Sequence, residues 1–398
     1  MIKILAFTAP LFFIRGEGGS LYIYDVLLLG SVLIGFQNVR VNMKFMLSSL
    51  FFILFCLVSV FYGVIFHSFD IEISLQSLVR YSFMLLLVPL ISNVYINDES
   101  KLKEYFNYLA FGMAVSVVVN FVGVYFSWPS FWGTGRAHGF YGNANWFGYM
   151  MVFSLYSFYY LSTQNKIFML VCFPLTILAI YNIILSGSNS ALFAVIVLMV
   201  WIFISGLSIR KVIAFSLLLL VMPTFLVLIS NSDYFSEFRG ATRFLNFFSV
   251  IFGDTPDGVS SLGSISERFE LILASIEVYV DYSGFLIGYG LSQTPVLFQS
   301  LGYHEASVHV NLISILIEVG LLGLLMYGVW LAFGYINFSE STLSRLNKKY
   351  IKGNLILFVF IGLFTPHVYL GFFFAFILPV WGRYEKLNWS SNGLSCHN

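Results

Sequence analysis

Two histidines and a glutamate lie within six residues in the stretch GYHEASVHVNLISILIEVG, residues 302–320, and a second glutamate follows in its apolar part. Glu305 and His309 are four residues apart, so a helix that has begun by Glu305 would place them side by side. A histidine titrates near neutral pH, which makes His309 a candidate general base for a reacting hydroxyl group. Glu318 lies about 13 Å deeper on a helix that rises ~1.5 Å per residue. Glu318 therefore cannot act on the same reacting group as His309.

Glu318 is an acid inside an otherwise apolar helix, and it has two interpretations. An ionisable residue within a membrane span is by default a candidate for function. Asn311, seven residues earlier, shares its helix face, so hydrogen bonding through Asn311 or a neighbouring span explains Glu318 equally well. His309 also has a structural alternative, because a single histidine at a membrane surface often has no chemical role.

Arginine side chains form a second set of candidates. The planar arginine fork matches phosphate oxygens and keeps its charge in a low dielectric, so converging arginines would bind a pyrophosphate. The alternative is that some of them pair with nearby acids such as Asp233, Glu237, Glu267 and Glu270. The titratable residues that we expect on one side of the membrane, together with His309, are Arg80, Arg136, His138, Arg239, Arg243, Arg268 and His304.

The segment WPSFWGTGRAHGFYGNANWFGYMM, residues 128–151, is rich in glycine, aromatic residues and asparagine. Glycine permits tight turns, and asparagine satisfies backbone groups that a turn leaves unpaired. One interpretation is a turn that leads into the next helix, with Asn143 or Asn145 as its cap. That interpretation leaves Arg136 unexplained, so Arg136, Asn143 and Asn145 are candidate binding residues.

The composition shows what must position these residues. The chain of 398 residues is 59% hydrophobic and 10% charged, whereas soluble domains carry roughly 25% charged residues. We therefore expect an all-α polytopic membrane protein with about twelve transmembrane helices of ~20 residues. The expected spans are residues 2–14, 20–36, 45–66, 76–96, 106–127, 144–162, 167–185, 189–205, 212–230, 308–336, 354–365 and 367–381.

The distribution of positive charge predicts the orientation. With both termini in the cytoplasm, the inner loops hold fourteen of the twenty Lys and Arg residues, and every lysine is among them. An excess of Lys and Arg in cytoplasmic loops is the expected pattern. The fourteen are Lys3, Arg40, Lys44, Lys101, Lys103, Lys166, Arg210, Lys211, Arg345, Lys348, Lys349, Lys352, Arg383 and Lys386.

This topology divides the chain into three regions. Residues 1–230 hold nine spans and the short outer loop 128–143, residues 231–307 form a large extracytoplasmic loop, and residues 308–398 hold three spans and a cytoplasmic tail. The large loop contains ERFELILASIEVYVD, whose apolar residues have helical spacing, and the compact FLIGYG. It therefore predicts one or two amphipathic helices against the membrane surface. A simple lid or spacer is the alternative.

Several chemical signals are absent from the sequence. It has no glycine-rich nucleotide loop, no HExxH, no DxD pair and no long basic run. We therefore expect no cofactor, no metal and no nucleic-acid partner. The three cysteines, Cys56, Cys172 and Cys396, predict neither a disulfide framework nor a metal site.

Three motifs give the chain a family resemblance. RAHGFYGNANWFG resembles an outer-loop pattern of Arg, Gly-Phe and Asn-Pro-Asn before a span. SERFELILASIEVYVDYSGFLIGYGLSQ resembles an amphipathic helix led by arginine and followed by a Gly-x-Gly turn. SVHVNLISILIEVGLLGLL resembles a His-x-Asn entrance to a helix that ends in Glu-x-Gly-Leu-x-Gly. In this order, the motifs resemble those of the O-antigen polymerase (Wzy-type) and O-antigen ligase families.

The resemblance implies a GT-C-like glycosyltransferase in the bacterial inner membrane, acting on the periplasmic face. The donor would be a glycan on undecaprenyl pyrophosphate, and a hydroxyl group of the acceptor would displace the pyrophosphate. By position, Arg268 and His309 match the family's phosphate-binding arginine and proposed base, and Arg136 matches less closely. Membrane lipids and a chain-length regulator are further expected partners.

The sequence departs from the family pattern at two positions. Ala144 replaces a proline, which only loosens a turn. In LSGSNSALFAV, Asn189 stands where many relatives have arginine after serine, so one expected phosphate-binding arginine is missing. Arg80, Arg239 or Arg243 could replace it, and the sequence does not choose among them.

Three functions compete. We favour the polymerase, which joins repeat units, over the ligase, which transfers finished glycan to lipid A-core, because the missing arginine and divergent outer loops suit the more variable family. A flippase for lipid-linked oligosaccharide is the alternative from another class. Twelve spans fit a flippase, but internal repeats are typical of transporters, and this sequence has neither a repeat nor another use for a 77-residue outer loop.

Overall fold

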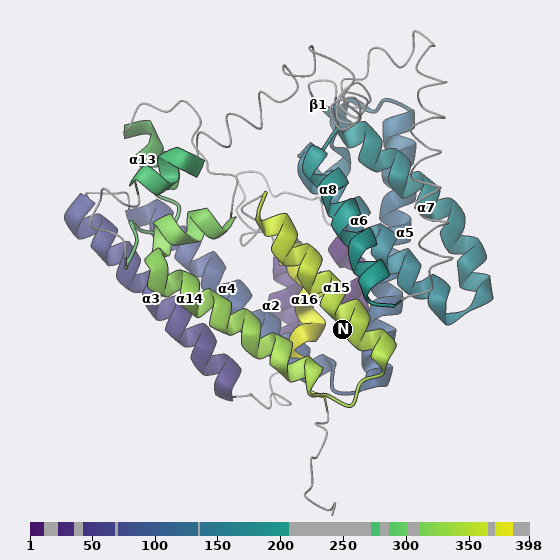
Figure 1. Cartoon of the computed structure of the whole chain (residues 1–398), viewed down its shortest axis with the longest axis horizontal. Coiled ribbons are helices and arrows are strands. Elements are labelled where there is room, and N and C mark those ends of the chain that lie inside the picture. Colours follow the sequence, from purple (N-terminus) through teal and green to yellow (C-terminus); the bar gives the residue numbers. More distant parts are fainter. Residues whose placement is uncertain are drawn as a thin grey trace, which may run out of the picture.

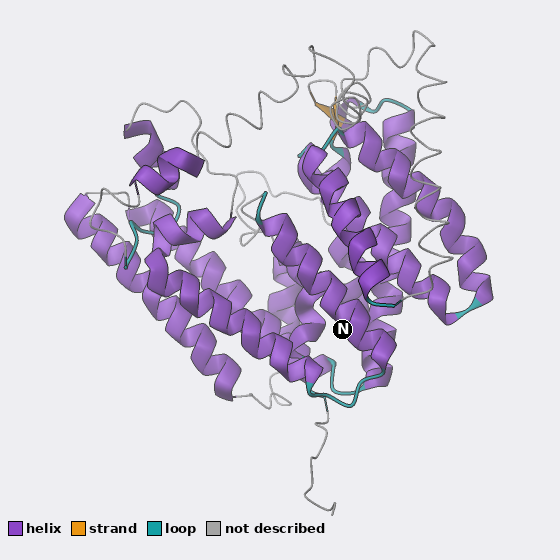
Figure 2. Ribbon diagram, in the orientation of Figure 1, coloured by secondary structure: helices purple, strands orange, loops and turns teal. Residues whose placement is uncertain are grey.

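A computed structural model describes residues 1–11, 23–35, 43–67, 71–133, 136–206, 272–278, 286–300, 311–364 and 371–384. Within these ranges the chain is almost entirely helical, with one short hairpin (Figure 2). The helices are α1 (Ile2–Thr8), α2 (Ile23–Gly35), α3 (Met43–His67), α4 (Ile71–Tyr95), α5 (Glu99–Tyr125), α6 (Ala144–Gln164), α7 (Lys166–Ser186), α8 (Asn189–Ile204), a turn of helix at residues 272–278, α13 (Thr294–Ser300), α14 (Asn311–Ser339), α15 (Arg345–Gly362) and α16 (Gly371–Ile377). Short 3-10 helices are η1 (Ala9–Leu11), η3 (Pro129–Phe131), η4 (Gly139–Tyr141) and η7 (Leu378–Trp381), and the hairpin strands are β1 (Trp132–Gly133) and β2 (Arg136–Ala137).

The described helices follow the apolar stretches of the sequence. Within the described ranges, five helices are long and apolar enough to cross a membrane, so the all-α membrane class is confirmed. The five segments are Met46–Phe66, Ile71–Tyr95, Glu99–Tyr125, Lys166–Ser186 and Leu312–Ser339. The count of twelve spans and the GT-C-like architecture stay predictions, and the expected span 212–230 lies outside the described residues.

The helices form two groups that α15 and α16 connect. In Figure 1, α3, α4 and α14 lie on one side of the view, and α5, α6, α7 and α8 lie on the other. α15 packs against α8 and α6 of one group and against α14 of the other. β1 and α13 are both at the top of the view, opposite the connection between α14 and α15. The bundle therefore has two distinct ends.

α6 forms the centre of its group. Every side chain from Phe147 to Phe158 is buried, which is typical of a helix surrounded by protein rather than lipid. Its polar groups bond to neighbouring helices: the Tyr149 hydroxyl donates to Ser190 of α8 at 2.6 Å, and Ser157 and the Tyr350 hydroxyl of α15 are 2.7 Å apart. This packing fixes the depth of the α6 N-terminus, which follows the hairpin.

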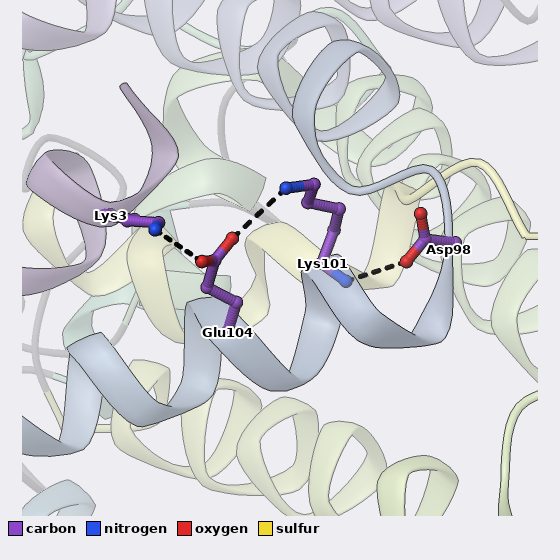
Figure 3. Close-up of polar contacts among 4 residues, drawn as sticks. All are labelled: Lys3, Asp98, Lys101 and Glu104. Carbon is purple, nitrogen blue, oxygen red and sulfur yellow. Dashed lines mark hydrogen bonds and ion pairs between the residues drawn. The ribbon is translucent and has the colours of Figure 1, made fainter.

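Ionic and polar contacts gather several lysine-bearing segments at one end of the bundle. Lys3 of α1 is 2.6 Å from Glu104 of α5, and Lys101 contacts the same carboxylate at 3.3 Å (Figure 3). The Asp98 side chain caps α5 by accepting from the Lys101 N–H at 2.8 Å. Asn347 of α15 donates to Glu99 at 2.6 Å. The grouping agrees with the assignment of these segments to one side, and its identification as the cytoplasmic side stays a prediction.

Candidate functional site

The hairpin segment before α6 holds Arg136 in place. β1 and β2 pair in antiparallel register, with Trp132 opposite Ala137 and Gly133 opposite Arg136. The backbone N–H of His138 donates to the Phe131 carbonyl at 2.9 Å, which ties the end of β2 to η3. These backbone bonds hold β1, β2 and η3 together, and they thereby fix the position of Arg136.

Arg136 joins the two helix ends nearest the hairpin. Its Nε donates to the carbonyl oxygen of Ser186, the last residue of α7, at 2.8 Å. Its Nη2 donates to the side-chain oxygen of Asn145, in the first turn of α6, at 3.1 Å. The arginine is partly buried between these groups. The structure therefore brings together the two candidates Arg136 and Asn145.

Asn143 begins α6 as its N-cap, which confirms the structural interpretation of this residue. Its side-chain oxygen accepts from the N–H groups of Asn145 at 2.9 Å and Trp146 at 3.3 Å. Gly142 immediately before it has φ 62°, a left-handed conformation that glycine adopts without strain. The turn and the cap set the direction in which α6 leaves the hairpin, and hence the position of Asn145 beside Arg136.

The connection between α7 and α8 is rich in hydroxyl groups. The Ser188 hydroxyl caps α8 by accepting from the Ala191 N–H at 3.3 Å, and it is 3.2 Å from the Ser190 hydroxyl. Asn189 is the first residue of α8, and its buried side-chain oxygen has no hydrogen-bond partner among the described residues. The positive end of the α8 dipole and the Arg136 charge lie at the same connection, so both favour an anion there.

Polar side chains inside α5 and α7 support this region, and their role was not predicted from the sequence. Asn120 accepts from the Phe140 N–H at 3.0 Å, and the Ser116 hydroxyl is 2.8 Å from that of Tyr141. Asn182 is fully buried in α7 and donates to the Val117 carbonyl at 3.2 Å. The sequence did contain a signal for this role. Ser116 and Asn120 are polar residues four apart in an apolar helix, a spacing that places both on one helix face.

Three further residues of the expected site have defined surroundings. His138 has a ring nitrogen 3.0 Å from the Gly139 carbonyl. Arg80, on α4, is partly buried. Glu318, on α14, accepts from the Thr294 hydroxyl at 3.0 Å. Arg80 and Glu318 belong to the α3, α4 and α14 group, whereas Arg136 belongs to the other (Figure 1).

The remaining expected residues lie outside the part of the chain that the structure describes. They are Arg239, Arg243, Arg268, His304 and His309. Their convergence with Arg136 stays a prediction. Among the residues that are described, no three His, Cys, Asp or Glu side chains come together as a group able to hold a metal ion.

Comparison with known proteins finds a family match over part of the chain. Residues 174–328 match a family model described as O-Antigen ligase. The matched segment begins inside α7 and ends inside α14, so it includes Ser186, Asn189 and Glu318 but not Arg136. It confirms the resemblance to the O-antigen polymerase and ligase families. No curated protein matches the chain.

Proposed function

We propose that this membrane protein, similar to the O-Antigen ligase family over residues 174–328, is a glycosyltransferase that polymerises oligosaccharide repeat units carried on undecaprenyl pyrophosphate. The product is O-antigen or a similar surface polysaccharide, made on the periplasmic face of the bacterial inner membrane. The observation that carries the proposal is the bond between Arg136 and Ser186. Arg136 lies outside the matched segment, but this bond holds its guanidinium at Ser186, which lies inside that segment and just before α8.

The chemistry is a displacement at the anomeric carbon. A sugar hydroxyl oxygen of the acceptor forms the new glycosidic bond, the bond from that carbon to the pyrophosphate breaks, and undecaprenyl pyrophosphate leaves. His309 takes the hydroxyl proton, a step typically worth ~100- to 10,000-fold in rate. The leaving group gains negative charge in the transition state, so fixed arginine donors stabilise it without a metal ion.

Arg136 also accounts for the missing arginine of the family pattern. Asn189 stands where many relatives have arginine, and Arg136 bonds to the carbonyl only three residues earlier in the chain. The positive charge at the start of α8 thus comes from the hairpin instead of from α8 itself. In this proposal Arg136 binds the pyrophosphate together with Arg268, and Asn143 and Asn145 set its position. Arg80, Arg239 and Arg243 are further candidates.

The acceptor distinguishes the polymerase from the ligase. The matching family model is described as O-Antigen ligase, so transfer of glycan to lipid A-core is the second candidate. Deletion of the gene separates them. Loss of a polymerase leaves lipopolysaccharide capped by a single repeat unit, whereas loss of a ligase leaves it without any O-antigen cap.

Turnover by the purified protein is the direct test. The protein in lipid nanodiscs receives a synthetic undecaprenyl-pyrophosphate repeat unit, and products are resolved by mass spectrometry. A ladder of lengthened lipid-linked glycans is expected, and the variants Arg136→Ala, Arg268→Ala and His309→Ala should lose it while remaining monodisperse. Arg383→Ala, at an exposed position after η7, is the control for loss of one arginine. Undiminished turnover by His309→Ala would refute the assignment of the base.

A further inference from the structure

α14 is interrupted where residues from the large outer loop dock onto it. Gly320 has φ 72° and ψ −176°, which breaks the helix between Val319 and Leu321. Residues 286–293 are here called the anchored turn. At the break they form backbone hydrogen bonds with α14, in place of some of the bonds that a continuous helix would form within itself. The backbone bonds are Tyr289 N–H to Ile317 carbonyl at 2.9 Å, Gly290 N–H to Glu318 carbonyl at 2.9 Å, and Leu322 N–H to Leu286 carbonyl at 3.3 Å.

Glycines permit this close approach of two backbones. A Cβ atom on Gly288 would lie 2.5 Å from the backbone of Glu318, and one on Gly320 would lie 2.4 Å from that of Leu286. A Cβ atom on Gly63 of α3 would lie 2.1 Å from the Tyr289 carbonyl oxygen. No larger residue fits these positions without moving the backbone. Glycines in three separate segments of the chain therefore permit the docking.

Side chains of α3 and α4 hold the anchored turn from the other side. The Ser59 hydroxyl of α3 donates to the Glu318 carbonyl and accepts from the Gly290 N–H at 3.0 Å. From α4, Ser74 donates to the Leu291 carbonyl at 2.9 Å, and Ser77 is 2.6 Å from the Ser292 hydroxyl. Three helices thus fix the turn, and the bonds are mostly buried, where hydrogen bonds are least exposed to competition from water.

One side-chain bond extends this attachment to α13. The Thr294 hydroxyl, at the first residue of α13, donates to the Glu318 carboxylate at 3.0 Å. Both side chains are almost fully buried, with 3% of Thr294 and 4% of Glu318 exposed. The bond therefore joins the first residue of α13 to the first half of α14. His309 lies between these two residues in the sequence.

A small apolar core lies beside the bond between Thr294 and Glu318. The outer-loop segments pack as a unit on the first half of α14, as Figure 1 shows for α13 and α14. Glu318 is the buried acid at the junction of this unit with the helices. The core contains Ala274 and Val278 from the helical turn 272–278, Leu297 and Phe298 from α13, Tyr289 from the anchored turn and Ile317 from α14.

We propose that Glu318 is a positioning residue: its bond to Thr294, with the anchored turn at the Gly320 break, fixes α13 against α14, the two described helices between which His309 lies in the sequence. This inference rests on the proposed function and gives Glu318 a role other than direct contact with the substrate. The carboxylate serves as a hydrogen-bond acceptor, so an amide oxygen at the same place should replace it. Removal of the bond should lower kcat much more than it changes KM for the lipid-linked donor.

Paired substitutions test the bond. Glu318→Leu and Thr294→Val remove the acceptor and the donor, and each should lower kcat about tenfold, with KM within about threefold, if misplacement of the base weakens proton transfer. Glu318→Gln and Thr294→Ser retain the bonding atoms and should recover most of kcat. The double variant Glu318→Leu with Thr294→Val should be no slower than the slower single variant, because both remove one interaction.

A matched control separates positioning from general loss of stability. Ser49 of α3 donates to the Leu85 carbonyl of α4 at 3.0 Å and accepts from Trp330 of α14 at 3.1 Å, so it joins the same three helices away from the turn. Ser49→Ala should lower thermal stability with kcat unchanged. An equal fall of kcat in Ser49→Ala and Glu318→Leu would overturn the proposal. Inactivity of Glu318→Gln equal to that of Glu318→Leu would also overturn it, because an ionisable carboxylate would then be required.

Hydrogen exchange provides a readout that does not depend on catalysis. The amides of Tyr289 and Gly290 should exchange slowly in the wild type and in Ser49→Ala, and faster in Glu318→Leu and Thr294→Val. If the wild-type protein shows this pattern but does not turn over the lipid-linked glycan, the proposed function fails and the attachment stands. Unchanged exchange in Glu318→Leu, with active wild type, would refute the positioning role alone.

Discussion

The guanidinium of Arg136 and the carbonyl oxygen of Ser186 lie 2.8 Å apart, so a two-residue strand is bonded to the last residue of a 21-residue helix. The bond places a permanent positive charge beside the connection that leads into α8. Asn189 begins α8 at that connection, and its side-chain oxygen has no partner among the described residues. We therefore expect that turnover requires a positive charge at this connection, whether β2 or α8 supplies it.

Relocation of the arginine tests this idea. Arg136→Ala should lower turnover by ~100-fold, as expected for loss of a fixed donor that stabilises transition-state charge. Adding Asn189→Arg should recover about tenfold of that loss, because a guanidinium returns to the same connection and can again form charge-assisted hydrogen bonds. Turnover of the purified variants with the synthetic lipid-linked repeat unit measures both effects. Asn189→Gln in the Arg136→Ala background is the control, and recovery by glutamine as well would contradict a requirement for charge.

Asn143 should separate helix capping from substrate binding. Asn143→Ala removes the cap of α6 and should lower the free energy of unfolding by about 1 kcal/mol, whereas Asn143→Ser should retain it. Asn143→Asp keeps the cap but adds negative charge beside the Arg136 region, so it should fold normally and raise KM for the pyrophosphate donor. Thermal unfolding in detergent and steady-state kinetics give the two readouts. An Asn143→Asp variant with unchanged KM would argue against an anion at this place.

Gly320 and Gly328 offer a matched comparison within α14. Gly320→Ala places a Cβ atom 2.4 Å from the Leu286 backbone at φ 72°, so it should destabilise the protein by roughly 2 kcal/mol or more. A Cβ atom on Gly328 would meet no other atom within 4 Å among the described residues, so Gly328→Ala should be neutral or stabilise the helix by up to about 1 kcal/mol. Melting temperatures of the two variants in the same detergent decide the point. Equal melting temperatures would show that the break at Gly320 is not required.

Side-specific labelling tests the orientation of the bundle. Ser130, before β1, and Thr342, between α14 and α15, are both exposed. With cysteines 56, 172 and 396 replaced, a membrane-impermeant maleimide should label Ser130→Cys in intact spheroplasts, and Thr342→Cys only after permeabilisation. The reason is that positively charged segments beside spans stay in the cytoplasm, and Thr342 shortly precedes Arg345, Lys348 and Lys349 in the first turns of α15. The reverse pattern would invert the topology and move the Arg136 site to the cytoplasmic face.

Sequence reasoning located most of the described helices because apolar composition over ~20 residues is a local property. The expected spans 167–185 and 189–205 overlap α7 and α8 closely, whereas α5 begins at Glu99, before the expected start at residue 106. Local chemistry also predicted Asn143 or Asn145 as the cap of α6, and the structure has Asn143 there. The family resemblance implied a Gly-x-Gly turn at Gly288 and Gly290, both of which have positive φ. Caps and turns depend on a few adjacent residues, which is why they could be read from the chain.

Contacts between residues that are far apart in the sequence could not be predicted in the same way. Nothing local to Arg136 indicates that it bonds to Ser186, 50 residues later, and nothing local to Glu318 indicates Thr294 as its partner. The break at Gly320 was also missed, because glycine is common in membrane helices and only the docked turn requires its φ of 72°. These features depend on which helices pack together.

From the sequence alone, the chain could be assigned to the all-α membrane proteins, its charged residues in apolar surroundings could be identified, and its motifs could be related to a family. Hydropathy, charge and short motifs suffice for that, because each is a property of neighbouring residues. The bond of Arg136 to Ser186, beside the α7–α8 connection, and the bond of Thr294 to Glu318 became known only from the folded bundle. Side chains far apart in sequence meet only after helix packing fixes their directions, so their partners are set by the folded bundle.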